Sequence, residues 1–406
     1  MYKKSALFFN PYLTSEVDGV GGVLKSYPED FIVEEIPSYT PSGSGEHCYL
    51  AIEKRGITTL EAIRRVAAGL KIQERNVGYA GMKDAAGITR QTISVQGVKP
   101  EKALSLKLDS VSILSAELHS NKLKLGHLKG NRFNIAIRGV SESAVQSVPK
   151  VLETLEKRGV PNFFGYQRYG LRGDSHLLGM AMLQRNWQLA TDLLIGEEAE
   201  ITDEEWAAAI LLYRKGDLAG ALHQFPPYCR SERDVLKRLI AKPEEYEKAF
   251  SSIHPRLKKL YLSATQSFLF DKAVAMRIQN LDVLLDGDLA VKHINGSCFM
   301  VGSAETEQGR ADDFEISASG PMFGCKMKCP EGDVWGVESE ILRSSGLELS
   351  MFDMPGGLRM EGERRVLRVP VTELTYDLED DRLNLRFVLP RGSYATSLVR
   401  EITKEF

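Results

Sequence analysis

The N-terminal part of the chain switches between the two-residue repeat of strands and the longer repeat of helices. Residues 29–39 (EDFIVEEIPSY) begin in a strand-like pattern that a proline interrupts, and residues 48–56 (CYLAIEKRG) predict a second strand. Residues 58–72 (TTLEAIRRVAAGLKI) predict an amphipathic helix, because their apolar side chains recur at helical spacing. Thr58 or Thr59 can cap this helix at its start.

A polar loop with glycines on both sides separates the next two apolar segments. Residues 76–81 (NVGYAG) and 88–95 (ITRQTISV) predict strands, and Asp84 lies in the loop between them. Asp is common in turns, since its side chain can bond its own backbone two residues further on. Taken by itself, Asp84 is therefore best interpreted as a turn former.

Two alternating runs follow within residues 121–140 (NKLKLGHLKGNRFNIAIRGV), and Gly130 with Asn131 predicts the joint between them. A helix is expected over roughly residues 143–157. Such alternation is typical of antiparallel strands with one face buried and the other exposed. We therefore predict the α+β class for the first 160 residues.

The pattern changes after residue 160 and returns to its first form at the end of the chain. Residues 175–285 are mostly helical in character, with 260–279 the clearest helix, and residues 283–370 are strand-like and rich in glycine. The tail, residues 382–406, again predicts a strand, a turn and a short helix. Because the tail resembles the first unit, we expect the middle to be an insertion. The expected domains are residues 1–160 with 371–406, and the inserted residues 161–370.

The composition is that of a soluble globular protein. The chain has 406 residues, of which 43% are apolar and 26% charged, and its five cysteines form no pattern of a secreted disulfide framework. The apolar run near the start is too short for an export signal, and the longest uncharged apolar stretch, near residues 206–213, is too short for a membrane span. We predict a cytoplasmic protein without a membrane segment.

Charge is distributed unevenly along the chain. The formal net charge is only −3, yet residues 51–140 hold 16 Lys and Arg against 7 Asp and Glu, a local net charge of +9. Residues 191–210 hold seven acids and neither Lys nor Arg. The first window could meet a polyanion, and the second would repel one. Before any motif is considered, two ordinary solvated faces are the favoured interpretation of this charge pattern.

The sequence offers little for a metal or a cofactor. Cys325 and Cys329 lie four positions apart, but no second pair stands at zinc-finger spacing, and neither His293 nor Cys298 completes a known pattern. No glycine-rich phosphate loop opens a helix, and no GxSxG motif occurs. We therefore expect neither a metal nor a cofactor, and chemistry on a carboxylate stays open.

Six segments, taken in order, resemble one family. Residues 78–95 (GYAGMKDAAGITRQTISV) resemble the most diagnostic motif of the TruD-type tRNA pseudouridine synthases, whose catalytic Asp follows a Lys and corresponds to Asp84. The other five are GVLKSYPEDFIVEEI (22–36), KGNRF (129–133), GVPNFFGYQRYG (159–170), LYLSATQSFLF (260–270) and LPRGSYATSLVRE (389–401). The resemblance runs from about residue 20 to the end and is weakest in the middle.

The resemblance implies both a fold and a reaction. The fold would be an α+β catalytic domain of the pseudouridine synthase type, with a mixed or antiparallel sheet, interrupted by a large α+β insertion. The reaction would isomerise a uridine of tRNA, usually the one at position 13, without a cofactor or an obligatory protein partner. An ionised Asp can serve by covalent or base catalysis. Attack on the base, attack on C1′ and proton abstraction at C2′ all stay open.

The resemblance also assigns roles around Asp84. Lys25, rather than the adjacent Lys83, is expected to pair with it, because neighbours in an extended chain point to opposite sides. Phe133 would stack on the extruded uracil, although a core aromatic is its simpler interpretation. The remaining candidates are Asn131 for positioning, Phe31 and Glu35 for support, and Arg90, Lys129 and Arg132 for phosphate contacts.

The segment Ala85–Gly87 departs from the family pattern, which commonly has basic and larger residues there. This departure is the one feature that favours a second hypothesis, an RNA-binding protein or RNA chaperone that does not rely on turnover. A third hypothesis is a small-molecule enzyme with a carboxylate nucleophile, and tight binding of tRNA would exclude it. The length of the chain, with its long insertion, indicates the archaeal branch of the family.

Overall fold

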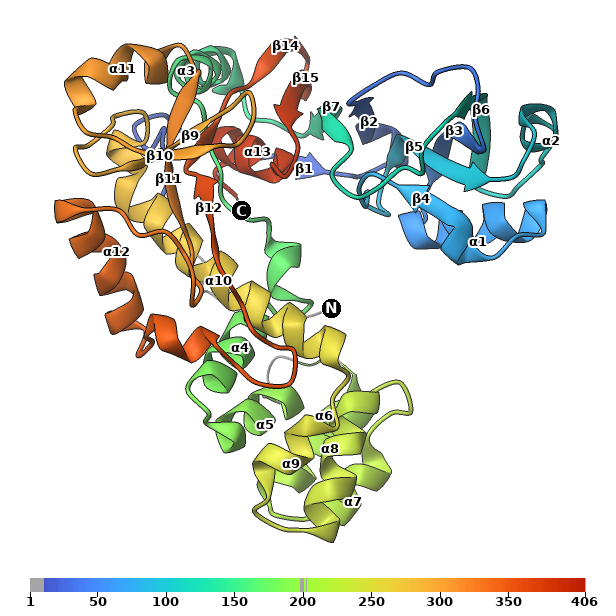
Figure 1. Ribbon diagram of the computed structural model, residues 1–406, viewed down its shortest axis with the longest axis vertical. Coiled ribbons are helices and arrows are strands. Elements are labelled where there is room, and N and C mark those ends of the chain that lie inside the picture. Colours follow the sequence, from blue (N-terminus) through green and yellow to red (C-terminus); the bar gives the residue numbers. More distant parts are fainter. Residues whose placement is uncertain (1–10, 198–200, 202, 406) are drawn as a thin grey trace. The chain divides into compact units, whose positions relative to one another are not determined.

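The chain in this computed structural model is described over residues 11–197, 201 and 203–405. The described chain divides into two compact units (Figure 1). The first, which we call the sheet unit, comprises Thr14–Val160 and the chain from Val369 onward. The second, which we call the inserted unit, comprises Pro161–Arg368 together with residues 11–13. The short strands β8 (Val160–Pro161) and β13 (Arg368–Val369) pair where the chain passes between the units.

A single mixed sheet organises the sheet unit. Within the described residues its main path is β14-β15-β7-β2-β5-β3-β6, with β1 paired to β7 and β4 paired to β5. Only the β2–β5 pair is parallel among these described pairings. The strands are β1 (Val23–Leu24), β2 (Phe31–Pro37), β3 (His47–Arg55), β4 (Val77–Tyr79), β5 (Ile88–Gln96), β6 (Val111–His119), β7 (Leu128–Arg138), β14 (Thr372–Glu379) and β15 (Arg382–Pro390). The α+β class predicted from the sequence is confirmed.

The helices of this unit are α1 (Thr59–Leu70), α2 (Pro100–Leu104), α3 (Ala144–Arg158) and α13 (Ala395–Thr403). Helix α1 forms where its apolar spacing predicted it, and the Thr58 side chain caps it by accepting a hydrogen bond from the backbone N–H of Glu61. Its buried residues form one core with apolar side chains of β3 and β5, so α1 covers one face of the sheet.

Strand register determines which side chains share that face. Residues directly opposite one another in paired strands point to the same side of a sheet. Val33 lies opposite Phe133 on β7 and opposite Thr89 on β5, and Thr89 lies opposite Lys54 on β3. Since Leu50 and Ile52 on β3 pack under α1 and alternate with Lys54, all these residues lie on the face that α1 partly covers. We call it the site face.

The inserted unit combines helices with a small sheet of strand order β10-β9-β11-β12. Its longest helix, α10, packs along α4 (Figure 1). The helices are α4 (Ser175–Leu183), α5 (Trp187–Ile195), α6 (Glu204–Arg214), α7 (Leu218–Gln224), α8 (Arg230–Ala241), α9 (Tyr246–Ser251), α10 (Pro255–Arg277), α11 (Ala304–Asp312) and α12 (Gly332–Ser344). The strands are β9 (Leu289–Lys292), β10 (Cys298–Met300), β11 (Ile316–Met322) and β12 (Glu363–Val366). The strand-like interpretation of residues 283–370 was therefore wrong for α11 and α12.

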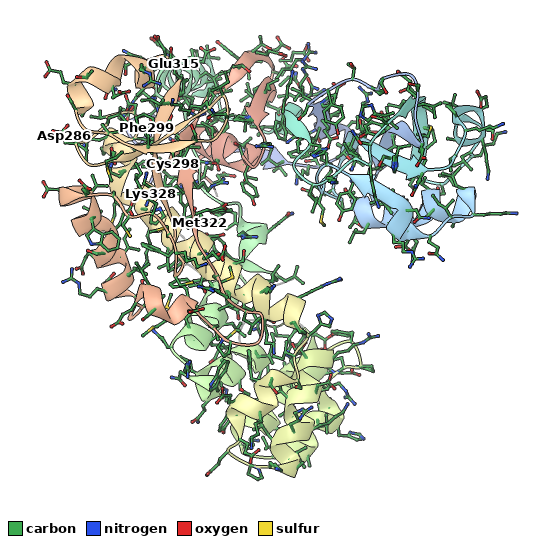
Figure 2. The ribbon with its side chains drawn as sticks, in the orientation of Figure 1. Asp286, Cys298, Phe299, Glu315, Met322 and Lys328 are labelled. Carbon is green, nitrogen blue, oxygen red and sulfur yellow. The ribbon has the colours of Figure 1, made fainter. Side chains whose placement is uncertain are left out.

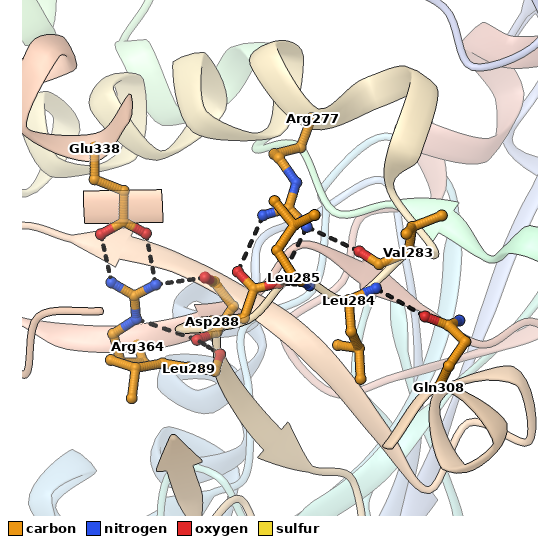
Figure 3. A network of polar contacts seen from close by, with 10 residues as sticks. Arg277, Val283, Leu284, Leu285, Asp288, Leu289, Gln308, Glu338 and Arg364 are labelled. Carbon is orange, nitrogen blue, oxygen red and sulfur yellow. Dashed lines mark hydrogen bonds and ion pairs between the residues drawn. The ribbon is translucent and has the colours of Figure 1, made fainter. Parts of the chain in front are cut away.

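Buried ion pairs connect helices α12 and α10 of the inserted unit to its sheet. Arg364 donates to both carboxylate oxygens of Glu338 at 2.7 Å, and Arg277 bonds Asp288 at 3.0 and 3.1 Å (Figure 3). Burial raises the pKa of Glu338, and Arg364 opposes this increase. Since each of these charged groups has its partner, the network is a structural element of this unit.

The three cysteines that were considered as metal ligands lie in two different segments of the inserted unit. Cys298 lies on β10 (Figure 2), whereas Cys325 and Cys329 lie after β11. Over the residues described, no three His, Cys, Asp or Glu side chains are grouped as metal ligands would be. No helix of the described chain combines the length and the apolar character that crossing a membrane requires.

Candidate active site

Asp84 lies in the loop that connects β4 to β5, and its carboxylate forms an ion pair with the ammonium group of Lys25. Lys25 follows β1 with a φ of +58°, which is the left-handed region that few residues other than glycine adopt. Its ammonium also lies 4.2 Å from the ring centroid of Phe31. The structure thus brings together three residues that the sequence motifs singled out.

The surroundings of Asp84 keep its carboxylate charged. Burial alone would raise its pKa, but the hydrogen bond and the charge of Lys25 lower the pKa further than burial raises it. The backbone N–H of Ala86 adds a hydrogen bond of 3.3 Å to the carboxylate. The net pKa lies below the ordinary value for Asp, and the side chain is still 24% exposed. Asp84 is therefore an ionised carboxylate that a ligand can reach.

A second lysine, Lys54, reaches the same loop from inside the sheet unit. Its side chain is fully buried at the end of β3, and Nζ donates to the backbone oxygens of Asp84 at 2.6 Å and Ile57 at 2.7 Å. Burial lowers the pKa of Lys54 to about 8, while the charge of Asp84 opposes and that of Lys83 reinforces this decrease. The motif comparison did not identify Lys54. The sequence does contain a sign that Lys54 is buried. Lys54 continues the alternation of Cys48, Leu50 and Ile52, and this alternation points its side chain inward.

A third contact anchors the loop from the Lys83 side. Lys83 Nζ lies 2.9 Å from Glu35 Oε2, and both side chains are almost completely buried. The Lys83 backbone N–H also donates to the Thr59 hydroxyl at 2.8 Å, which connects the loop to the first turn of α1. Glu35 in turn accepts a hydrogen bond from the Thr92 backbone at 3.2 Å. Lys83 and Asp84 thus point to different partners, and Glu35 contacts the loop rather than the Asp84 carboxylate.

Phe133 and Asn131 lie on β7, on the site face. Phe133 is 6% exposed and its ring stacks on Phe387 with centroids 5.2 Å apart. Asn131 lies opposite Glu35, and its side-chain oxygen is buried without a hydrogen-bond partner in the part of the chain that the structure describes. An unpaired buried acceptor costs free energy unless a ligand completes it. The site face thus carries, two residues apart on β7, an aromatic ring and an acceptor without a partner among the described residues.

The predicted phosphate contacts separate into two groups. Arg132 and Arg90 lie opposite Glu34 in register, one residue out of phase with Phe133, and so point to the other face of the sheet. There, Arg132 pairs with Glu373 at 2.9 Å, and Arg90 pairs with a carboxylate of β3 at 2.9 Å. Lys129 is exposed at the start of β7, where a register shift between Ile36 and Pro37 in the β2–β7 pairing interrupts the alternation, so register assigns it to neither face. Both arginines point to the reverse side.

The glycine that ends the Asp84 loop is required by the structure. Gly87 has a φ of +148°, and a Cβ at this position would lie 2.3 Å from the backbone oxygen of Phe31. Any larger residue here would push the loop away from Phe31. Gly87, one residue of the departing segment, therefore serves the close packing of the loop in this chain, whereas nothing in the structure explains Ala85 and Ala86.

Comparisons with known proteins agree with one another. The family model "tRNA pseudouridine synthase D (TruD)" matches residues 9–402. A tRNA pseudouridine synthase D of Geotalea daltonii is 57% identical over 395 residues, 97% of this chain and 100% of the relative. The protein of the same name from Thermus thermophilus is 36% identical over 97% of this chain and 92% of the relative. A crystal structure of a TruD-type protein from Methanosarcina mazei has a TM-score of 0.84 at 26% identity, over 97% of this chain and 96% of that one.

These relatives correct the inference of an archaeal branch. The Geotalea protein is bacterial, and it is matched along its whole length by a chain with this insertion. A second bacterial relative, from Geobacter metallireducens, is 54% identical over 97% of both chains. The inference rested on length alone, and length does not separate the branches, because bacterial members of the same length exist.

Proposed function

Because the chain belongs to the TruD family of tRNA pseudouridine synthases, we propose that it isomerises a uridine of tRNA to pseudouridine and that Asp84 is the reacting residue. In this reaction the N1–C1′ bond breaks, the uracil turns, and C5 bonds to C1′. The hydrogen leaves C5 and N1 gains one, so the reaction is neutral in electrons and needs no external reductant or energy source. A group that attacks or removes a proton beside the sugar is required.

The observation that carries this proposal is the ionised carboxylate of Asp84 in its ion pair with Lys25. Such a carboxylate can attack C1′, attack the base or remove the proton at C2′, and the pairing serves all three routes. A cation beside the carboxylate keeps it charged when a nucleotide excludes water from the site. Lys25 therefore acts on Asp84 and not directly on the uridine.

The sheet unit is assigned the contacts for the uracil and its phosphates. We assign Phe133 to the ring of the extruded base and the Asn131 side-chain oxygen to an N–H of that base. Stacking of a base on an aromatic side chain contributes roughly 1–3 kcal/mol, which helps offset the few kcal/mol that extrusion costs. Lys129, exposed near the start of β7, is assigned to a phosphate. Phe31 supports the Lys25 ammonium, and Glu35 supports the loop.

We extend the proposal to the substrate position and the compartment. The target is the uridine at position 13 of tRNA, the position implied by the family resemblance. The compartment is the cytoplasm, where tRNA is modified and where free cysteines persist; all five cysteines of the chain are free. Arg90 and Arg132 contact tRNA only if the RNA reaches the reverse face of the sheet.

The test is release of tritium from tRNA labelled at C5 of uridine, with the wild type and Asp84→Asn side by side. The wild type is expected to release tritium, and Asp84→Asn none above background, while both bind tRNA within about twofold of each other. A second tRNA with cytidine at position 13 should release none. If the wild type binds tRNA and releases no tritium from a mixed tRNA pool, the non-catalytic RNA-binding hypothesis replaces this one.

A further inference from the structure

The described contacts around the catalytic loop include a charged group whose partners are neutral. Lys54 is 0% exposed, and its ammonium donates to two backbone oxygens, those of Asp84 and Ile57. The inward positions before it on β3 are Cys48, Leu50 and Ile52, all of which belong to the apolar core under α1. A lysine therefore continues a row of core side chains and brings a charge to the edge of that core.

Burying this charge opposes folding. An ammonium that leaves water needs compensation, and two neutral carbonyl groups compensate it less than a carboxylate would. An apolar side chain of similar length would fill the same space without that cost, and such replacements of buried charges are often neutral or stabilising. Lys54 therefore does not serve stability. It serves to hold the two backbone groups that it contacts in position.

The two oxygens that Lys54 joins belong to different parts of the site. Ile57 precedes Thr58, the residue that caps α1, so its oxygen is fixed by the start of a well-packed helix. The Asp84 oxygen belongs to the reacting residue itself. The carboxylate of Asp84 is held separately by Lys25 and the Ala86 backbone. Lys54 thus fixes the main chain of Asp84, and these other groups fix its side chain.

We propose that Lys54 is a positioning residue for the isomerisation: it holds the Asp84 main chain against the start of α1 so that the carboxylate meets the sugar of the extruded uridine. This proposal rests on the function proposed above. Lys54 does not touch the uridine, and its removal leaves tRNA binding intact. The expected loss is in turnover, because a displacement of about 1 Å in a reacting group can cost about 100-fold in rate.

The first test is the variant Lys54→Met, which keeps the length of the apolar stem and removes the ammonium. Its turnover in the tritium-release assay is expected to fall by about 100-fold. Its KM for tRNA should stay within twofold of the wild type, and its melting temperature should be equal or higher. The matched control is Ile52→Met, which changes the same row of β3, two residues earlier, without affecting a polar contact, and should keep wild-type turnover.

A pH profile separates positioning from plain packing. The charges around the ammonium are Asp84 and Lys83, and these are paired with Lys25 and Glu35 respectively. With its pKa near 8, Lys54 loses its charge as the pH rises above that value. Wild-type turnover should therefore fall on the alkaline side with a midpoint near pH 8, and Lys54→Met should lack this decrease.

The outcomes separate this proposal from the function on which it rests. Absence of tritium release by the wild type would overturn both. Release by the wild type and equal release by Lys54→Met would overturn the positioning role alone. A Lys54→Met protein that melts below the wild type and loses tRNA binding would also overturn it, because Lys54 would then support the fold. Lost turnover with binding and stability retained is the result that the proposal requires.

Discussion

Glu35 and Lys83 form an ion pair beneath the Asp84 loop, with Oε2 and Nζ 2.9 Å apart and both side chains almost inaccessible to water. Glu35 projects from β2, whereas Lys83 immediately precedes Asp84. A pair buried to this degree contributes little net stability, because desolvation offsets the attraction between the charges. Removing one partner has a much larger effect, since the other charge is left buried and alone.

We expect Glu35→Ala to lower the free energy of unfolding by about 3–5 kcal/mol, the cost of an unpaired buried charge. Denaturant titration of the wild type and the variant measures this difference. The double variant Glu35→Leu, Lys83→Met should recover most of the loss, because it leaves no charge behind. A loss below about 1 kcal/mol for Glu35→Ala would show that Lys83 finds another partner or that water reaches it.

Replacing Lys25 by Ala should change the pH dependence of turnover. Burial raises the pKa of Asp84, and Lys25 is the main group that reverses this effect. Without Lys25 the pKa should rise above its ordinary value, so the acid-side decrease in turnover should move to higher pH. Tritium release measured from pH 4 to 8 tests this shift, with Lys25→Arg as the control that retains a cation. Identical acid-side profiles for the wild type and Lys25→Ala would rule out the pairing as the cause.

The buried carboxylate of Asp30 should make stability depend on pH in the acid range. Asp30 is 0% exposed and accepts hydrogen bonds from Arg138 at 2.7, 2.9 and 3.1 Å, and these lower its pKa. A lowered carboxyl pKa adds stability that is complete above the unfolded value of 3.8 and is lost as pH falls through the folded value. Asp30→Asn should therefore cost about 1–3 kcal/mol at pH 7.

The same measurement below pH 4 provides the check on Asp30. Unfolding free energies of the wild type and Asp30→Asn should converge there, because the wild-type carboxyl also loses its charge. The lowest pH used in this comparison must stay above the pH at which the whole protein denatures. If the difference in unfolding free energy between the wild type and Asp30→Asn stays constant from pH 7 to 3, the shape of the amide, and not the missing charge, causes the loss of stability.

The sequence predicted those parts of the site that local pattern or family motifs determine. Asp84 and Lys25 come from the motifs, and α1 comes from its apolar spacing and its Thr58 cap. Lys54 was missed because a lysine at the end of a strand is usually exposed, and its burial depends on tertiary packing under α1. Arg90 and Arg132 were grouped with the site by closeness in sequence, although strand alternation turns both away from Phe133.

The inserted unit shows a different limit of prediction. Helices α11 and α12 contain Gly309 and Gly336, and such residues weaken a helical pattern in the sequence. Both helices nevertheless form in a segment that was interpreted as strand-like, where α12 buries Val334, Ile341 and Leu342 and α11 buries Ala311. Burial of these side chains in the tertiary structure outweighs their local helix propensity. The sequence pattern alone does not show which side chains the tertiary structure buries.

Salt dependence should distinguish Lys129 from Arg132 in tRNA binding. Lys129 is exposed, whereas Arg132 is held by Glu373 and lies within 3.7 Å of Glu34. Each phosphate contact contributes about 0.7–0.9 to the slope of log affinity against log salt. Lys129→Ala should reduce that slope by about this amount, and Arg132→Ala should leave it nearly unchanged. The reverse result would place the RNA on the face that carries Arg90 and Arg132, and the assignment of the phosphate contacts would move there.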